Sequence, residues 1–467
     1  MAPPPDAGRQ RRILAVCCLA QFMVLLDVTV VNVALPAIRA DLGFTMAGLA
    51  WVVNAYTLAL AGCLLLGGRA ADLLGRREVF TGGLVLFGLA LLVGGLAQDG
   101  ATLVAARAAQ GLGGAVIAPA GLSVLCTTFA EGPERNRALA WWGTLGGLGG
   151  ASGALVGGVL TATLSWRWAL LAGAPVCFGV ALAALRVIPA LGRPSGAARS
   201  FDVSGALCVT AGLVLVISGI VAVERHGLVS VASLGSLTDG AALLALFALI
   251  EGRLAAVPLV PLHVVRSRAL AGASLVVFCL GGVAFSLWFL FTLHLQQLLG
   301  LSALQAGLAF VPMSLTIVVA TRVSSRLVAP FGPGRVMATG MALLGTGMLL
   351  LARVDADGTW ARDLLAPSLL CAAGIGASFV PAAIAATSGV AGAESGLATG
   401  VLNTAYQTGS SLGVAVLATI AAHAAPGDGF ATAFLAGGLL AFIGCATALL
   451  MLVRPVHRAS RPRETCS

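Results

Sequence analysis

Long apolar segments separated by short polar loops form the dominant pattern of this chain. A helix needs about 20 residues to cross the hydrocarbon layer of a bilayer, which is about 30 Å thick. The apolar segments that approach or exceed this length are 13–36, 48–67, 79–97, 101–126, 138–162, 168–189, 204–223, 233–250, 269–292, 303–325, 334–352, 364–388, 397–421 and 430–453. One segment in roughly 33 residues leaves room for a helix and a loop but not for a soluble domain. The pattern predicts an all-α integral membrane protein with 14 transmembrane helices.

Ionisable side chains interrupt this pattern at Asp27 in the first segment and at Arg107 in the fourth. A charge near the middle of a membrane helix costs about 2.5–3.5 kcal/mol even on the mild insertion scale. Such residues usually mark a substrate or proton path. Helical spacing puts Gln110 on the face of Arg107, whereas Asn32 points about 140° away from Asp27. We therefore expect Asp27 to face a central cavity and to carry a proton there.

Two structural alternatives remain for these charges. Arg107 lies only a few residues inside its segment, so its side chain could extend to the membrane interface. Asp27 could be buried only to pair with a structural arginine, and Arg107 is the candidate partner.

Composition supports a membrane location. Hydrophobic residues make up 59% of the chain and charged residues 10%, and the mean hydropathy is +1.00. Ordinary soluble domains carry about 25% charged residues. Most of the ten cysteines fall within apolar segments, where cysteine behaves as a small hydrophobe. They suggest neither a disulfide framework nor a metal site.

The net charge of +9 comes from arginine alone, because the chain contains no lysine. With a cytoplasmic N-terminus, 21 of the 27 arginines fall in cytoplasmic segments and five in external ones, as the positive-inside rule requires. We therefore expect both termini in the cytoplasm and the helices in the cell membrane. The scattered arginines disfavour nucleic-acid binding. No nucleotide site is expected either, because a phosphate-binding loop needs a lysine.

The loop between the second and third segments carries glycines and charges at fixed spacing. Gly68, Asp72, Gly75, Arg76 and Arg77 follow the pattern G-x-x-x-D-x-x-G-R-R, which resembles the loop signature of the major facilitator superfamily. Glycine permits a tight turn, and Asp72 is expected to cap a helix start and to pair with an arginine. We expect these residues to form a cytoplasmic gate. A loop that merely sets orientation would explain only the two arginines.

Glycine is concentrated in the fifth segment. Gly149, Gly153, Gly157 and Gly158 are expected to let another helix approach closely, and they resemble the glycine-rich signature of antiporters in that superfamily. Ala154 stands where the signature has a proline, so the kink that proline would cause is not expected. The resemblance implies export rather than uptake. Ordinary helix packing is the alternative for each single glycine.

The stretch LDVTVVNVALP at residues 26–36 resembles the first-helix signature of the fourteen-helix drug:proton antiporters, the EmrB/QacA branch. Further similarity lies in WVVNAY at 51–56 and in GLATGVLNTAYQTGSSLG at 396–413. The resemblance implies the major facilitator fold and a role for Arg107 in proton coupling. The expected domains are an N-terminal six-helix bundle (1–190), two inserted helices (191–252), a C-terminal six-helix bundle (253–453) and a cytoplasmic Arg-rich tail (454–467).

A member of this family is expected to export small lipophilic or cationic compounds such as antibiotics in exchange for protons. The proton gradient drives the exchange, so no cofactor is needed, and the partners are substrate, protons and the lipid bilayer. Asp27, Arg107 and Gln110 are the candidates for coupling. The candidates for lining the cavity are Asn32, Asn54, Tyr56, His294, Gln297, Asn403 and Gln407.

Three other functional classes were weighed. A proton-coupled symporter for nutrient uptake would share the fold, and only the direction of transport separates it from an exporter. A membrane-embedded enzyme would need clustered catalytic or metal-binding residues, whereas the five histidines are dispersed along the chain. A ligand sensor without transport would not need an intramembrane acid.

Overall fold

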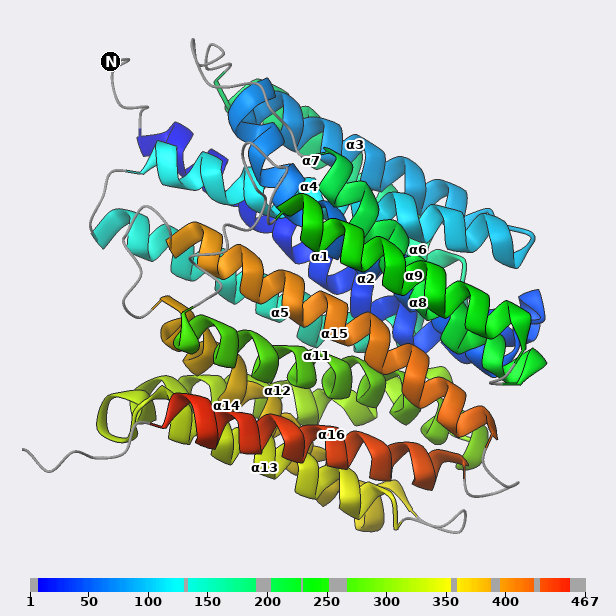
Figure 1. Ribbon diagram of the computed structural model, residues 1–467. Helices are drawn as coiled ribbons and strands as arrows, with labels where there is room; N and C mark the ends of the chain where they lie inside the picture. The colour runs from blue at the N-terminus through cyan, green and yellow to red at the C-terminus, as the bar shows by residue number, and fades with distance from the viewer. Residues whose placement is uncertain are drawn as a thin grey trace, which may run out of the picture.

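The computed structural model describes residues 7–129, 133–189, 203–227, 230–251, 267–353, 359–387, 395–423 and 429–453. Helices that run side by side make up this part of the chain (Figure 1). The first half comprises α1 (Ala7–Leu42), α2 (Met46–Leu74), α3 (Arg76–Gly95), α4 (Gly100–Thr128), α5 (Pro133–Thr163), α6 (Trp168–Leu171) and α7 (Gly173–Val187). Two helices follow, α8 (Val203–His226) and α9 (Val231–Leu249). The second half comprises α11 (Arg268–Leu293), η2 (His294–Leu298), α12 (Ala303–Phe331), α13 (Pro333–Leu351), η3 (Trp360–Leu364), α14 (Leu365–Thr387), α15 (Ser395–His423) and α16 (Gly429–Leu452).

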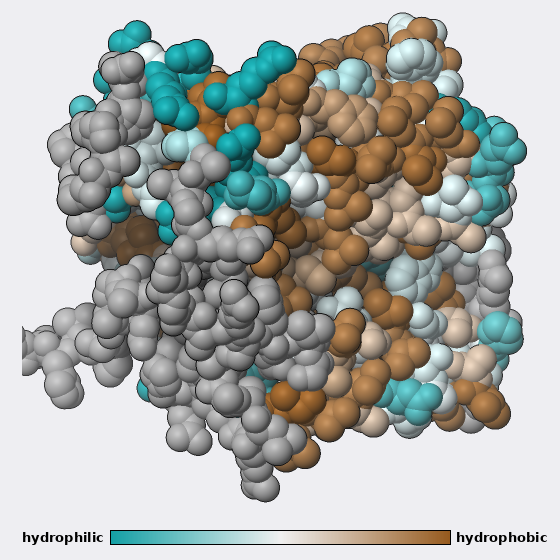
Figure 2. Space-filling model, turned by 90° about the horizontal axis from the view of Figure 1, so that it is seen from above, coloured by the Kyte–Doolittle hydropathy of each residue, from teal (hydrophilic) through white to brown (hydrophobic). Residues whose placement is uncertain are grey.

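Each predicted membrane segment coincides with one helix or with two helical pieces in direct succession. Among the described residues, 11 helices are long and apolar enough to cross a membrane. Shorter apolar stretches lie in α2 (Gly48–Leu64) and α8 (Leu207–Val223). Figure 2 shows one face of the molecule on which hydrophobic side chains form a broad surface, with hydrophilic ones gathered toward its edges. The prediction of an all-helical membrane protein is confirmed.

Two glycine turns connect neighbouring helices closely. Gly75 joins α2 to α3 with a φ of +107°, and Gly332 joins α12 to α13 with a φ of +79°. Only glycine adopts such angles readily. The expectation that Asp72 caps a helix start is wrong, because Asp72 lies in the last turn of α2 and Gly75 occupies the N-cap position of α3.

The helices of each half pack mainly against one another. α8 and α9 form a hairpin that packs on α2 of the first half and on α15 of the second. Leu58 of α2, Leu213 and Ile217 of α8 and Ala415 of α15 form a small apolar cluster there. The expected domain limits at 190/191 and 252/253, and the tail 454–467, lie outside the described residues.

Hydrogen bonds join the two halves where the last part of α1 contacts η2. Arg39 Nη1 donates to Gln297 Oε1 over 3.1 Å, and Gln296 Nε2 donates to the carbonyl oxygen of Val33 over 2.9 Å. We call this the closed end of the molecule. The arginine distribution predicts that it faces outside.

Candidate transport site

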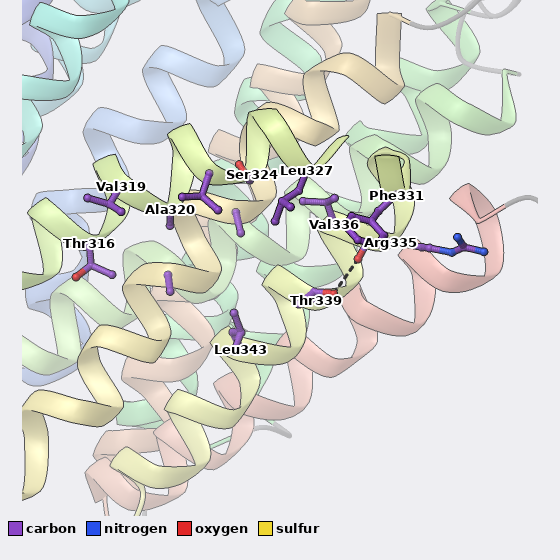
Figure 3. Close-up of a pocket in the computed structure, with 13 residues that line it drawn as sticks. Thr316, Val319, Ala320, Ser324, Leu327, Phe331, Arg335, Val336, Thr339 and Leu343 are labelled. Atoms are coloured by element: carbon purple, nitrogen blue, oxygen red, sulfur yellow. Dashed lines mark hydrogen bonds between the residues drawn. The ribbon is translucent and has the colours of Figure 1, made fainter. Parts of the chain in front are cut away.

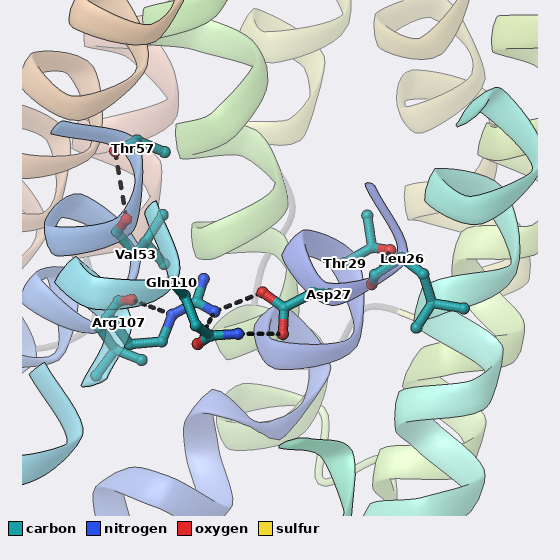
Figure 4. Close-up of polar contacts among 8 residues, drawn as sticks. Leu26, Asp27, Thr29, Val53, Thr57, Arg107 and Gln110 are labelled. Atoms are coloured by element: carbon teal, nitrogen blue, oxygen red, sulfur yellow. Dashed lines mark hydrogen bonds and ion pairs between the residues drawn. The ribbon is translucent and has the colours of Figure 1, made fainter. Parts of the chain in front are cut away.

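A buried ion pair links the two charged residues of the first half. Arg107 Nη1 lies 2.5 Å from Asp27 Oδ2, and each residue is only 2% exposed. The Gln110 side chain contacts both: its Oε1 accepts from Arg107 Nη1 over 2.8 Å, and its Nε2 donates to Asp27 Oδ1 over 3.1 Å. Figure 4 shows the three side chains converging from α1 and α4. The structure thus brings together the three residues expected to act in proton coupling.

Further contacts hold the guanidinium of Arg107 within the bundle. Its Nε donates to the carbonyl oxygen of Val52 in α2 over 3.0 Å, and its Cζ lies 4.5 Å from the centre of the Tyr56 ring. An arginine over an aromatic face is stabilised by the ring quadrupole. Burial and these contacts exclude the alternative in which Arg107 extends to the membrane interface. Tyr56, expected to line a cavity, lies beside this arginine.

Asp27 also borders a small cavity of about 130 Å³ between α1, α3, α5, α6 and α7. All the lining residues belong to the first half, and Asp27 is the only charged one. Thr29 points to a different side of α1, where it packs against Gly153 of α5. Helical geometry therefore separates the two polar faces as expected. That Asp27 faces a cavity between the halves stays a prediction.

The glycines of α5 serve two separate helix contacts. A Cβ at Gly149, Gly153 or Gly157 would collide with backbone oxygens of α1. At Gly158 an added Cβ would lie 2.7 Å from the carbonyl oxygen of Ala303 in α12. Three glycines therefore pack α5 within the first half, and the fourth lets it contact the second half.

The predicted gate loop is described only in part. The surroundings of Gly68 and the side chain of Asp72 are outside what the structure describes. The ion pair expected for Asp72 therefore stays a prediction. Gly75 makes the turn, Arg76 and Arg77 open α3, and Arg77 Nε is buried with no hydrogen-bond partner in the described part.

Polar residues meet where α2 of the first half packs on α15 of the second. The hydroxyl groups of Thr57 and Ser411 lie 2.5 Å apart. Asn54 precedes Thr57 by one helical turn, and Gln407 precedes Ser411 by one turn. Both amide atoms of Asn54 and the Oε1 atom of Gln407 are buried without a hydrogen-bond partner in the described part. Unsatisfied buried polar atoms are costly, so these amides are suited to bind a polar ligand.

The other predicted lining residues occupy different surroundings. His294 is 1% exposed and lies 5.4 Å from the ring centre of Phe430 and 6.0 Å from that of Phe434. Neither of its ring nitrogens has a partner among the described residues. Gln297 accepts a hydrogen bond from Arg39 at the closed end. Asn32 is buried and Asn403 half-buried.

Comparison with solved structures matches this arrangement over nearly the whole chain. A human organic anion transporter, MFSD10 (TETRAN), superposes with a TM-score of 0.62 and 18% identity, covering 96% of this chain and 100% of the transporter. A peptide transporter, POT, in complex with sulfate superposes with a TM-score of 0.69 and 14% identity, covering 94% of each chain. At such low identity these matches establish the fold alone.

The sequence profile of the Major Facilitator Superfamily matches residues 17–352 and 273–467. The chain belongs to the major facilitator superfamily. Among its relatives in this superfamily is the cephamycin export protein CmcT of Amycolatopsis lactamdurans, 41% identical over 94% of this chain and 90% of the relative. Another is the puromycin resistance protein pur8 of Streptomyces alboniger, 40% identical over 88% of this chain and 82% of the relative. Its relatives are transporters and not enzymes.

Several contacts between the halves of this superfamily member were missed by sequence analysis. Thr57 and Ser411 are 354 positions apart, and Arg39 is 258 positions from Gln297. Short polar residues inside membrane helices are common hydrogen-bonding groups, so the presence of Thr57 and Ser411 was a weak signal. Nothing local in the sequence indicates that they pair with each other.

Proposed function

We propose that this protein is a proton-coupled exporter of small lipophilic or cationic antibiotics. The names of its relatives support this proposal, because they include an export protein for one antibiotic and a resistance protein for another. The buried pair of Asp27 and Arg107 is the observation that carries proton coupling. A buried carboxylate that contacts a single cation has two charge states, and these favour different packing around it.

In the proposed cycle, Asp27 is ionised while it is paired with Arg107. A proton from outside neutralises the Asp27 carboxylate and weakens the ion pair. Gln110 can hydrogen-bond to Asp27 in either protonation state, because its amide group both donates and accepts. The guanidinium keeps its bond to Val52 and its contact with Tyr56. These two contacts therefore keep Arg107 in position when the ion pair with Asp27 is broken.

The cycle assigns the closed end to the outside. We propose 14 membrane crossings with both termini in the cytoplasm, two six-helix bundles (1–190 and 253–453) and two inserted helices (191–252). The structure then corresponds to a state shut toward the outside by the bonds of Arg39 and Gln296. Opening outward breaks these bonds and the Thr57–Ser411 contact. The gate loop at 68–77 closes the cytoplasmic side in the opposite state.

Substrate is proposed to bind between the halves, where both amide atoms of Asn54 and the Oε1 atom of Gln407 are available for hydrogen bonds. Asn403 lies one turn from Gln407 on the same face of α15. The proton gradient alone drives this exchange, and the protein needs no cofactor for it.

The decisive experiment measures accumulation of a cephamycin, puromycin and a cationic dye in a host without its own pumps. We expect the wild-type chain to lower accumulation, and an uncoupler to abolish the difference. Asp27→Asn should reduce export at least about tenfold because it removes the titrating group. Asp41→Asn is the matched control, because Asp41 is an exposed acid of the same helix that pairs with Arg167 at the surface.

Membrane insertion and protein amount must be equal for all variants. Unchanged export by Asp27→Asn would contradict the coupling role. Accumulation that rises with the wild-type chain would instead indicate uptake by a symporter.

A further inference from the structure

A groove formed by α12, α13 and α14 encloses a cavity of about 610 Å³ (Figure 3). Its walls are mainly aliphatic and include Val319, Val323 and Leu327 of α12, Val336 and Leu343 of α13, and Ala377 of α14. α12 and α13 are joined by the Gly332 turn and diverge beyond it, so α14 forms the floor of the groove.

The groove opens away from the other half of the molecule. Gly307 marks the face of α12 that packs on α5, because a Cβ added there would lie 2.6 Å from the carbonyl oxygen of Ala154. Thr316 lines the groove nine residues later. At about 100° per residue, nine residues correspond to two and a half turns, so Thr316 lies on the side of α12 opposite Gly307. The groove therefore faces the lipid rather than the interface between the halves.

Apart from Arg335 at its end, the groove is lined by no described side chain with a free polar group. The hydroxyls of Thr316, Ser324 and Thr339 donate to carbonyl oxygens of their own helices over 2.8, 3.0 and 3.0 Å. A polar ligand would find few partners on such walls. A hydrocarbon chain would bury them from the surrounding lipid without any polar cost.

The length of the groove fits one leaflet. At 1.5 Å per residue it extends about 12 Å along α13, from Arg335 to Leu343, and about 22 Å along α12, from Thr316 to Phe331. One leaflet with its headgroup region is about 20–22 Å thick. Half of the hydrocarbon layer is about 15 Å thick. The groove thus extends from one membrane surface to near the middle of the bilayer.

Positive charge surrounds the surface end of the groove. Figure 3 shows Arg335 at this end with its guanidinium directed away from the groove centre. Arg326 flanks the lining face of α12 about one and a half turns before this end, and Arg322 lies about one turn farther along the helix. All three arginines are exposed. None of them forms an ion pair with a residue that the structure describes. Unpaired arginines next to a lipid-facing groove suit the phosphate of an anionic lipid.

We propose that this groove is a binding site for an anionic phospholipid of the leaflet at the end opposite the closed end, the cytoplasmic leaflet in the orientation proposed above. One acyl chain lies along α12 and α13, and the phosphate contacts the guanidinium of Arg335. The site does not depend on the transport reaction.

Lipid retention by the purified full-length chain tests this proposal. The protein is equilibrated in detergent with equal amounts of palmitoyl-oleoyl phosphatidylglycerol and phosphatidylethanolamine, separated from free lipid, and analysed by native mass spectrometry. Wild type is expected to retain phosphatidylglycerol preferentially. Arg335→Gln should lower this preference about fivefold, and Val319→Trp should lower retention of both lipids because it fills the groove.

Two matched variants serve as controls. Arg353→Gln removes an exposed arginine just beyond the other end of α13, and Leu308→Trp adds the same bulk on the same side of α12 but outside the groove. Both should retain lipid as wild type does. Equal phosphatidylglycerol preference in wild type and Arg335→Gln would overturn the proposal. Unchanged lipid retention in Val319→Trp would also overturn it. A wild-type dimer that Val319→Trp dissociates would do the same, because a second copy of the chain would then occupy the groove.

Discussion

The two halves share a fold but stabilise their interiors differently. The first half buries an ion pair, that of Asp27 and Arg107. In the second half, no buried ion pair occurs among the residues that the structure describes. Aromatic pairs occupy its interior instead: the Trp288 and Phe310 rings stack at 4.6 Å, and Tyr406 meets Phe379 at 5.3 Å.

Polar groups of the second half are mostly satisfied within single helices. Ser286, Ser378 and Ser410 each donate to a carbonyl oxygen four residues earlier, over 2.6 to 2.8 Å. Such bonds do not depend on the position of a neighbouring helix. The bond between Asp27 and Arg107 does, because it joins α1 to α4. In the proposed cycle, protonation of Asp27 therefore acts on a contact between two helices of the first half.

The largest expected effect concerns the stability of the charged pair. Arg107→Met leaves Asp27 buried without its partner, which should cost about 3–5 kcal/mol of unfolding free energy. The double variant Asp27→Leu/Arg107→Met removes both charges and should recover most of that loss, because apolar replacement of a buried pair is often nearly neutral. Unfolding in mixed detergent micelles measures both values.

Export measured on the same double variant completes the test. We expect a stable protein without proton-coupled export. A double variant as unstable as the single one would mean that the pair mainly holds the first half together. Proton-coupled export by the double variant would show that the ion pair of the first half is not needed for coupling.

A smaller effect is expected for the buried histidine of the second half. His294→Phe should leave export within about twofold of wild type and raise the unfolding free energy by about 1–2 kcal/mol, because the unpaired ring nitrogens are removed. His294→Ala is the control and should cost about 2 kcal/mol or more through the cavity it creates. Loss of coupled export in His294→Phe would show that the second half also carries a titrating group.

The smallest effects concern one helix cap in each half. Asp99 caps α4 by accepting from the backbone N–H of Thr102, and this bond lowers the pKa of the Asp99 carboxyl. Its contribution is present above the unfolded pKa near 3.9 and is lost as the pH falls through the lower folded value. Asp99→Ala should therefore lower the Tm at pH 7, and the loss should become smaller as the pH falls below about 3.9.

The cap of α12 in the second half should not depend on pH. Ser302 and Gln305 form a capping box of neutral side chains. Ser302→Ala should cost about 0.5–2 kcal/mol, and the difference from wild type should be the same at pH 7 and pH 3. If the stability losses of Asp99→Ala and Ser302→Ala changed with pH in the same way, the conclusion that only the α4 cap depends on a charged side chain would be contradicted.

The positions of the helices were predictable from the sequence. Apolar segments of membrane length are a local property, and each one coincides with helical structure. Gly75 was also recognisable as a turn residue, since a loop that short needs a positive φ. The charged residues proposed for proton coupling were recognisable because a charge in an apolar segment is costly. The role of Asp72 was misjudged because the exact end of a helix depends on the turn that follows it.

Other features follow from tertiary packing alone. The pairing of Asp27 with Arg107, the division of the α5 glycines between α1 and α12, and the contact of Thr57 with Ser411 join positions far apart in the chain. Each depends on which helix lies beside which and at what angle. The sequence by itself determined that charges are buried and where the helices run, because composition and periodicity are local. Only the fold decided their partners, because partners are set by contacts between helices that the chain brings together from distant segments.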